Sequence, residues 1–257
     1  MLFSPAAHSI GCEFQPLVCL KSGKPQAYEA LARFYAIDGS AIAPNQVFDA
    51  LHTCPHALAE AELAAKRLQL ALAPCSVPLF VNLDPHSLTQ EQQGALIPHL
   101  QKRSNLVVEL IENTCISDAL EALSLRRLLS DAGVAVALDD IGAPHAMLSL
   151  ELLSQVDWVK FDRHWLTRLH IKSERKLLEA LVDYTQAVGK QTVIEGIETE
   201  AQLEAVSAFG FTLAQGFLFQ DKFIKPVVKE ALSPKVVTVL QSLTSHHSLH
   251  ATALKTD

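Results

Sequence analysis

Long apolar runs are missing from this 257-residue sequence: none approaches the roughly 20 residues that a helix needs to cross a bilayer. The first residues, MLFSPAAHSIGCEF, also lack the basic region followed by a long apolar stretch that marks an export signal. We therefore expect no membrane span and a cytoplasmic location.

Paired cysteines and basic clusters are also missing. The five cysteines are scattered, odd in number and never in a C-x-x-C pair, which excludes a disulfide framework and a zinc knuckle. The net charge is −7 and no long run of Lys and Arg occurs, so we expect no binding to duplex nucleic acid. A small phosphate ligand bridged by metal ions stays possible.

What the sequence does contain is an alternation of short strand-like runs with longer helix-like stretches, in units of about thirty residues. About eight such units give the usual length of a (β/α)8 barrel, close to 250 residues. The predicted fold is an α/β, TIM-like barrel in one domain over residues 1–257, with a core of about 10–240 and a frayed tail of about 243–257. The predicted strands are 14–20, 27–33, 79–83, 106–110, 134–139, 157–161, 192–195 and 212–214.

Two details refine this prediction. The segment EFQPLVCLKSGKPQAYEALARF reads as two strands around a tight turn, so the barrel is expected to begin with an antiparallel strand. Ser117 and Thr199 are placed as helix N-caps. A doubly wound open sheet is the alternative fold, but the sequence has no G-x-G-x-x-G turn for it.

Acidic and amide side chains stand at or just past the ends of the predicted strands. In a barrel those strand ends meet at one rim, so residues distant in sequence would converge there. Ionised side chains in such a place are costly unless a cation gathers them, and oxygen-only ligation selects Mg²⁺ or Mn²⁺ over zinc. This reading predicts two divalent cations bound among Glu29, Asn82, Glu109, Asp139, Asp140, Asp162 and Glu195.

Two such ions about 4 Å apart are a recurrent arrangement for displacement at phosphorus, which makes phosphodiester hydrolysis the leading chemistry. Lys160 lies two residues before Asp162 and is placed to hold either the attacking water or the developing charge. Arg33 is placed to bind a phosphate with its planar guanidinium. Most of these residues have ordinary explanations when taken singly, but adjacent carboxylates such as Asp139 and Asp140 repel each other unless a cation intervenes.

The sequence resembles the EAL domain, the cyclic di-GMP phosphodiesterase fold. YEALAR at 28–33 carries the signature tripeptide, and the other matching motifs follow in the family's order. They are FQP near the start, FVNLDP at 80–85, VELIE at 108–112, DDIG at 139–142, VKFD at 159–162, EGIET at 195–199 and QGFLF at 215–219. Since no cyclase, sensor or receiver motif precedes them, we expect a stand-alone EAL protein that hydrolyses cyclic di-GMP to linear pGpG.

The resemblance implies a role for each matching residue. Glu29, Asn82, Glu109 and Asp139 would bind one metal, and Asp139, Asp140 and Glu195 the second, with Asp162 at or beside it. Lys160 would orient the attacking water and Glu195 would act as general base, while Glu112 would steady the loop after the paired aspartates. The ligand would be bound by Gln15, Leu31, Arg33, Glu198 and Gln215.

The loop at 141–148 departs from the family pattern. The family usually continues Phe-Gly-Thr-Gly-Tyr-Ser-Ser-Leu after the paired aspartates, whereas this chain reads IGAPHAML, with Pro144 in place of a glycine. Two alternatives to the enzyme therefore stand: a catalytically silent cyclic di-GMP receptor, and an EAL-derived protein-interaction regulator. The family also leads us to expect a homodimer, and a regulatory protein partner is possible.

Overall fold

The computed structural model describes residues 7–85, 87, 89–111, 116–144 and 146–242. Within these ranges a ten-stranded sheet closes on itself through eight strands. The barrel strands are β1 (Ser9–Cys19), β2 (Pro25–Tyr35), β4 (Leu79–Asn82), β5 (Leu106–Ile111), β6 (Ala135–Ile141), β7 (Trp158–Phe161), β8 (Gln191–Ile194) and β9 (Leu213–Ala214). Two short edge strands, β3 (Ala41–Ile42) and β10 (Glu230–Ala231), extend β2 and β1.

Strand pairing confirms the predicted barrel with an antiparallel first strand. From β2 to β9 every neighbouring pair in the barrel is parallel, and β1 closes it by pairing antiparallel with both β2 and β9. The β1–β2 hairpin is long, with Cα partners from Ser9↔Tyr35 to Val18↔Pro25. The predicted boundaries 14–20 and 27–33 were therefore too short for these two strands.

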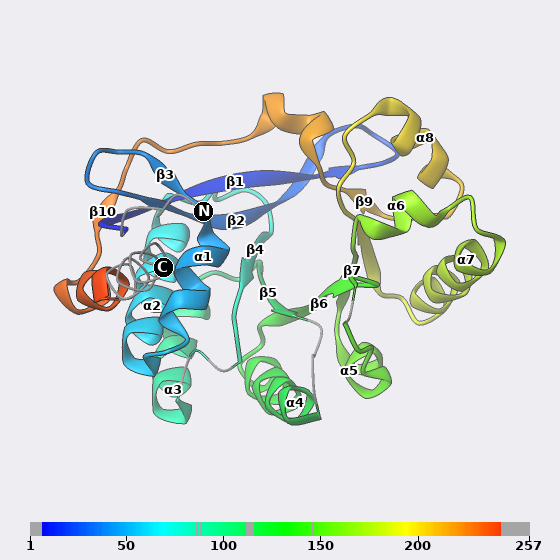
Figure 1. Ribbon diagram of the computed structural model, residues 1–257. Coiled ribbons are helices and arrows are strands. Elements are labelled where there is room, and N and C mark those ends of the chain that lie inside the picture. Colours follow the sequence, from blue (N-terminus) through cyan, green and yellow to red (C-terminus); the bar gives the residue numbers. More distant parts are fainter. Residues whose placement is uncertain (1–6, 86, 88, 112–115, 145, 243–257) are drawn as a thin grey trace, which may run out of the picture.

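Helices connect the parallel strands and lie outside the barrel. The long hairpin of β1 and β2 crosses the top of Figure 1, α2 to α5 lie below it, and α7 and α8 stand on the side away from α1 to α3. The helices are α1 (Pro44–Leu51), α2 (Pro55–Leu72), α3 (Gln90–Leu100), α4 (Ile116–Asp131), α5 (Leu150–Gln155), α6 (His164–Arg168), α7 (Lys172–Ala187) and α8 (Glu200–Ser207), with a 3₁₀ segment at Phe217–Lys222.

The first residues of α4 and α8 can be compared with the two predicted N-caps, Ser117 and Thr199. The Thr199 hydroxyl oxygen accepts a hydrogen bond from the backbone N of Gln202, and the Gln202 side-chain oxygen accepts one from the backbone N of Thr199. Helix α8 therefore begins with a capping box, as expected. The other prediction was wrong, because α4 begins at Ile116 and Ser117 lies inside it.

The predicted frayed tail, residues 243–257, lies outside the described residues. None of the described helices is long and apolar enough to cross a membrane.

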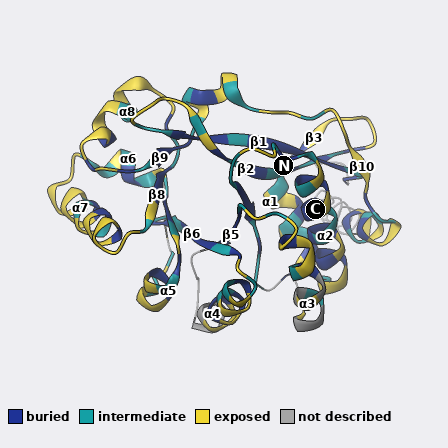
Figure 2. Ribbon diagram, turned by 180° about the vertical axis from the view of Figure 1, so that it is seen from behind, coloured by how far each residue is buried: buried dark blue, intermediate teal, exposed yellow. Residues whose placement is uncertain are grey.

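Buried apolar side chains form two separate clusters. The larger one fills the space between the strands and the surrounding helices. In Figure 2 the strands are mostly buried, while the outward faces of α7 and α8 are exposed. The smaller cluster fills the barrel itself with one buried side chain from each of seven strands, and the partly buried Trp158 of β7 packs against it. Its buried members are Leu17, Ala27, Phe80, Val107, Ala137, Val193 and Leu213.

Phe80 is the largest buried side chain of this inner cluster and is fully buried, with Trp158 against it edge to face at 5.0 Å between ring centroids. Truncation would leave a cavity in the middle of the barrel. We expect Phe80→Ala to lower the free energy of unfolding by about 3–5 kcal/mol, measured by urea denaturation. Phe217→Ala is the matched control, because Phe217 is 60% exposed. A cost for Phe80→Ala no greater than that of the control would contradict a packed inner cluster.

Candidate active site

A polar layer lies directly on the inner apolar cluster. Each of the eight barrel strands contributes to it a residue two positions from its inner apolar residue, because side chains two apart on a strand face the same way. Glu195 and Gln215 come just after β8 and β9, where the bonds Glu195 N to Phe161 O and Gln215 N to Ile194 O continue the ladder. The layer consists of Gln15, Glu29, Asn82, Glu109, Asp139, Lys160, Glu195 and Gln215.

Lys160 occupies the middle of this layer and is 1% exposed. Its Nζ lies 2.6 Å from Glu109 Oε1, 2.9 Å from Asp139 Oδ1, 2.6 Å from Glu195 Oε1 and 3.5 Å from Glu29 Oε2. Burial alone would lower the pKa of Lys160, but the four carboxylates outweigh burial and raise it well above its ordinary value. The ammonium is therefore charged, and it is the cation that holds the carboxylates together.

Glu29 is oriented by two amides. Asn82 Nδ2 donates to Glu29 Oε1 at 2.8 Å, and Gln215 Nε2 donates to Glu29 Oε2 at 2.6 Å. Burial opposes ionisation of Glu29, but the Lys160 charge and these hydrogen bonds prevail and lower its pKa. Since the amide nitrogen of Asn82 is committed to Glu29, its carbonyl oxygen is the atom left to bind a metal or ligand.

Buried carboxylate oxygens in the layer have few hydrogen-bond donors. Glu109 Oε2 is buried and has none among the described residues. Glu109 Oε1 and Asp139 Oδ1 are also buried, and they face the Lys160 ammonium at 2.6 Å and 2.9 Å. Buried carboxylate oxygens are rarely left this way, so the donor set fits a further cation.

The paired aspartates both reach the site because the strand is distorted between them. In a regular strand Asp139 and Asp140 would point to opposite faces. Asp140 instead has φ 57°, in the left-handed region, and the pairing of β6 with β7 shifts register between Leu138 and Ile141. This conformation costs of the order of 1 kcal/mol for a residue other than glycine. The backbone is thus strained so that two carboxylates face one cavity.

Three of the carboxylates come close enough to share one ion. Oxygens of Asp139, Asp140 and Glu195 all lie within 4.8 Å of one another. Burial and neighbouring carboxylates raise the pKa of Asp139 and raise that of Glu195 well above its ordinary value. Burial and the Asp139 carboxylate raise the pKa of Asp140 to about 7. Burial is the largest cause of each shift, and the neighbouring carboxylates raise these pKa values further although Lys160 opposes them.

Asp162 lines the same cavity, but its contacts differ. Its Oδ1 accepts a hydrogen bond from the backbone N of His164 at 2.8 Å, and the Nδ1 of the same histidine also contacts it. The predicted residue is therefore near the paired aspartates but not among the three carboxylates that share one point. His164 fixes its orientation, a role that the sequence pattern did not suggest.

A cavity of about 350 Å³ opens over the polar layer. Two of its lining residues are glycines with no room for a side chain: a Cβ on Gly196 would lie 2.2 Å from Arg163 Cβ, and one on Gly216 would lie 2.1 Å from the Ile197 carbonyl oxygen. Eleven of the predicted site residues line it, together with Arg163 and Phe217. They are Gln15, Glu29, Leu31, Asn82, Asp139, Asp140, Lys160, Asp162, Glu195, Glu198 and Gln215.

The remaining predicted residues lie close by, with one exception. Glu109 is fully buried in the floor, against Lys160. Arg33 lines a neighbouring cavity of about 320 Å³ that shares Leu31 and Asn82 with the first. Its Nη2 donates to Glu13 Oε1 at 2.8 Å, so a carboxylate already holds the guanidinium. Glu112 lies outside the described residues.

Comparison with known proteins agrees with this geometry. The family model described as the EAL domain matches residues 6–222. The chain belongs to the EAL domain family. It is 31% identical over 132 residues to the bifunctional diguanylate cyclase/cyclic di-GMP phosphodiesterase MucR of Pseudomonas aeruginosa, covering 51% of this chain and 19% of MucR. It is 26% identical over 219 residues to the blue light- and temperature-regulated antirepressor BluF of Escherichia coli, covering 80% and 52%.

Solved EAL structures share the fold. The PaMucR phosphodiesterase in complex with c-di-GMP superposes with a TM-score of 0.63 and 24% identity, covering 88% of this chain and 93% of that one. Vibrio cholerae LapD bound to c-di-GMP gives a TM-score of 0.70 at 21% identity, covering 81% and 53%. This EAL chain spans between a fifth and about a half of the length of MucR and BluF.

Sequence reasoning missed several residues of this EAL site. Glu13 is buried and joins Gln15 Nε2 at 3.0 Å, Arg33 and Lys225. It lies two residues from Gln15 on β1, so the strand period could have placed it on the same face. Arg163 directly follows Asp162, and Phe217 lies two residues after Gln215; both line the cavity. The turns after β7 and β9 bring these side chains to the cavity, and the strand pattern does not predict those turns.

The raised carboxylate pKa values make a prediction about stability without metal. A carboxyl group whose pKa is raised by folding contributes stability at low pH, and that contribution is lost as pH rises through the raised value. Glu109, Asp139, Asp140 and Glu195 are shifted up, whereas Glu29 and Glu13 are shifted down. We expect the unfolding free energy in chelator to fall from about pH 5 to about pH 8, measured by urea denaturation at each pH.

A divalent cation at 100 times its Kd at pH 8 should restore about 2.7 kcal/mol at that pH. The same concentration should restore less at pH 5, because protonated carboxyl groups bind the cation more weakly. Asp140→Asn keeps a side chain that tolerates the left-handed conformation but removes one raised carboxyl group, so its pH dependence should be shallower. A metal-free protein whose stability rises over this range would contradict the raised pKa values.

Proposed function

We propose that this chain is a metal-dependent phosphodiesterase that hydrolyses cyclic di-GMP to linear pGpG. The observation that carries the proposal is the polar layer, in which one buried ammonium faces four carboxylates whose oxygens are partly without donors. Membership of the EAL family supports it, as do relatives named as cyclic di-GMP phosphodiesterases, MucR and the probable phosphodiesterase PdeG of Escherichia coli.

Two Mg²⁺ or Mn²⁺ ions fit the donor set. One would be held by Glu29, Asn82, Glu109 and Asp139, and the other by Asp139, Asp140 and Glu195 with Asp162 beside it. When bound, the ions supply Lewis-acid polarisation of the phosphate and of water. The Glu109 Oε2 atom without a donor, the buried Oδ1 of Asp139 and the carbonyl oxygen of Asn82 support the first set. The common 4.8 Å sphere supports the second.

Lys160 and Glu195 carry out the proton transfer in the proposed hydrolysis. Lys160 Nζ donates a hydrogen bond to the attacking water, and a Glu195 carboxylate oxygen, 2.6 Å from that nitrogen in the structure, accepts the proton of the water. The new bond joins the water oxygen to phosphorus while the bond from phosphorus to one ribose 3′ oxygen breaks. That oxygen takes up a proton from solvent and leaves as a hydroxyl group, Glu195 returns its proton to solvent, and the product keeps a 5′ phosphate.

Substrate binding falls to residues around the cavity. Arg33 would bind a phosphate or guanine from a position already fixed by Glu13, and Gln15 and Gln215 are linked to each other at 3.3 Å beside Glu29. Leu31 and Glu198 line the wall. We also propose that Glu112 steadies the loop after the paired aspartates. A single-domain organisation, a homodimer and a regulatory protein partner are further parts of the proposal.

A specific observation favours a second candidate, a catalytically silent cyclic di-GMP receptor. The altered loop after Asp140 is tied to α6, with Trp165 Nε1 donating to the Ile141 carbonyl at 2.7 Å and Arg168 Nη2 to the Gly142 carbonyl at 2.7 Å. Pro144 removes a donor from this loop. The similarity to the antirepressor BluF also supports a regulatory role.

The deciding experiment is chromatography of cyclic di-GMP incubated with the purified protein and Mg²⁺ or Mn²⁺. We expect pGpG to accumulate, and Glu29→Gln to lower the rate by at least about 100-fold, since it removes a charge that faces Lys160. Glu204→Gln is the matched control, because Glu204 is exposed on α8 and the same change there removes a charge outside the cavity.

A binding titration in Ca²⁺ separates the two candidates. Tight binding without product would assign the chain to the receptors and reject the enzyme. The absence of both binding and product would reject both and leave an interaction protein. Equal loss of activity in Glu29→Gln and Glu204→Gln would show that the polar layer is not the catalytic site.

A further inference from the structure

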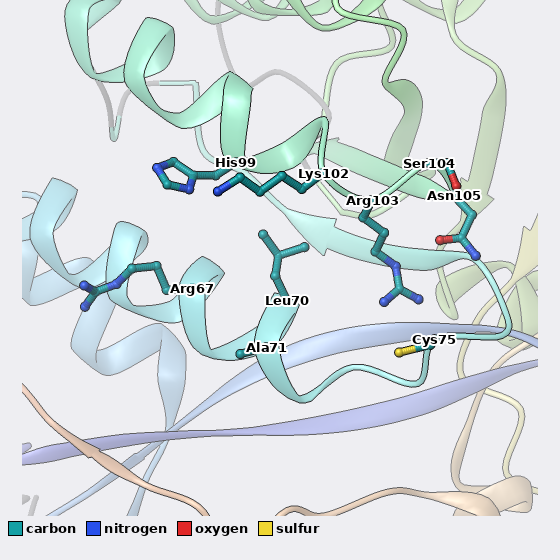
Figure 3. Close-up of a pocket in the computed structure, with 9 residues that line it drawn as sticks. All are labelled: Arg67, Leu70, Ala71, Cys75, His99, Lys102, Arg103, Ser104 and Asn105. Carbon is teal, nitrogen blue, oxygen red and sulfur yellow. The ribbon is translucent and has the colours of Figure 1, made fainter.

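A second cavity, of about 520 Å³, lies at the opposite end of the barrel. Cys75 precedes β4 and Asn105 directly precedes β5, so the cavity is at the amino-terminal ends of strands whose other ends carry Asn82 and Glu109. Side chains from α2 and from the end of α3 face each other across it (Figure 3). It is lined by Arg67, Leu70, Ala71, Cys75, His99, Lys102, Arg103, Ser104 and Asn105.

This lining carries positive charge and no carboxylate. Three permanent cations, Arg67, Lys102 and Arg103, contribute to it, together with His99, although the chain as a whole has a net charge of −7. Some other basic side chains are paired with acids, as in Lys66 with Glu62 and Arg175 with Glu179. In the described ranges no ion pair joins Arg67 or Lys102 to a carboxylate. These two side chains therefore have no acidic partner that an anionic ligand would have to displace.

Arg103 is held in place by the backbone. Its Nη2 donates to the Pro74 carbonyl at 2.5 Å and to the Val77 carbonyl at 2.7 Å, which fixes the plane of the guanidinium. Burial lowers the pKa of Arg103, partly offset by Cys75, because no carboxylate balances its charge. A guanidinium fixed in this way loses little conformational entropy when it binds an oxyanion.

We propose that this cavity binds a small phosphate-bearing anion of nucleotide size with at least two negative charges. Guanidinium and ammonium donors on facing walls suit phosphate oxygens, and Ser104 and Asn105 add neutral donors. Leu70 and Ala71 give an apolar wall for the body of the ligand, and the volume lies within the usual range for ligand pockets, about 300–1,000 Å³. The site is separate from the polar layer and its occupancy does not depend on the proposed hydrolysis.

The test is calorimetry of the full chain with GTP and, separately, inorganic pyrophosphate, in EDTA and low salt. Without metal the carboxylate-rich cavity repels anions, so binding there does not interfere. We expect one GTP per chain, and the double variant R67A/K102A to weaken binding at least tenfold. Arg103 is kept because its bonds to Pro74 and Val77 support the chain itself.

The matched control is R127A/K172A, which removes one arginine and one lysine from exposed positions on α4 and α7. Thermal unfolding of both variants checks that they fold. GTP binding that is unchanged in R67A/K102A, or weakened equally in R127A/K172A, would overturn the site. Pyrophosphate binding as tight as GTP would keep an anion site but overturn its nucleotide size.

Discussion

The architecture of this site depends on one buried ammonium. Lys160 lies 1% exposed among Glu29, Glu109, Asp139 and Glu195, all within 3.5 Å of its Nζ. Removing these charges from water costs several kcal/mol for each ion unless partners compensate it. The apolar cluster below excludes water, and the amides of Asn82 and Gln215 orient Glu29. The barrel can keep so many acids together only because a cation stands at their centre.

Much of this could be predicted from sequence because barrel geometry converts a simple pattern into proximity. Acidic residues at strand ends, read with the alternation of strands and helices, placed Glu29, Asp139 and Glu195 at one rim, and the antiparallel first strand followed from the turn between β1 and β2. The motifs of the EAL family then assigned the fold to the whole pattern. Each of these inferences uses only the period of a strand and the direction of the chain.

The rest needed information that the sequence does not carry. Asp140 faces the cavity only through a left-handed residue and a register shift, and a strand pattern predicts the opposite face for it. The helices α5 and α6 have six and five residues, too short for helical periodicity to be read. The ion pair of Arg33 with Glu13 on the neighbouring strand was not predicted, because this pairing depends on the register of β1 and β2.

Charge balance links the strained backbone to the need for cations. The carboxylates of Glu29, Glu109, Asp139, Asp140 and Glu195 face one ammonium, so full ionisation leaves four negative charges uncompensated. Two divalent cations would cancel that excess, whereas a ligand with two phosphodiester groups adds two more negative charges. An anionic substrate is therefore repelled from this rim until cations arrive. The left-handed Asp140 brings one further carboxylate to the rim at a cost in backbone energy, a cost that cation binding would offset.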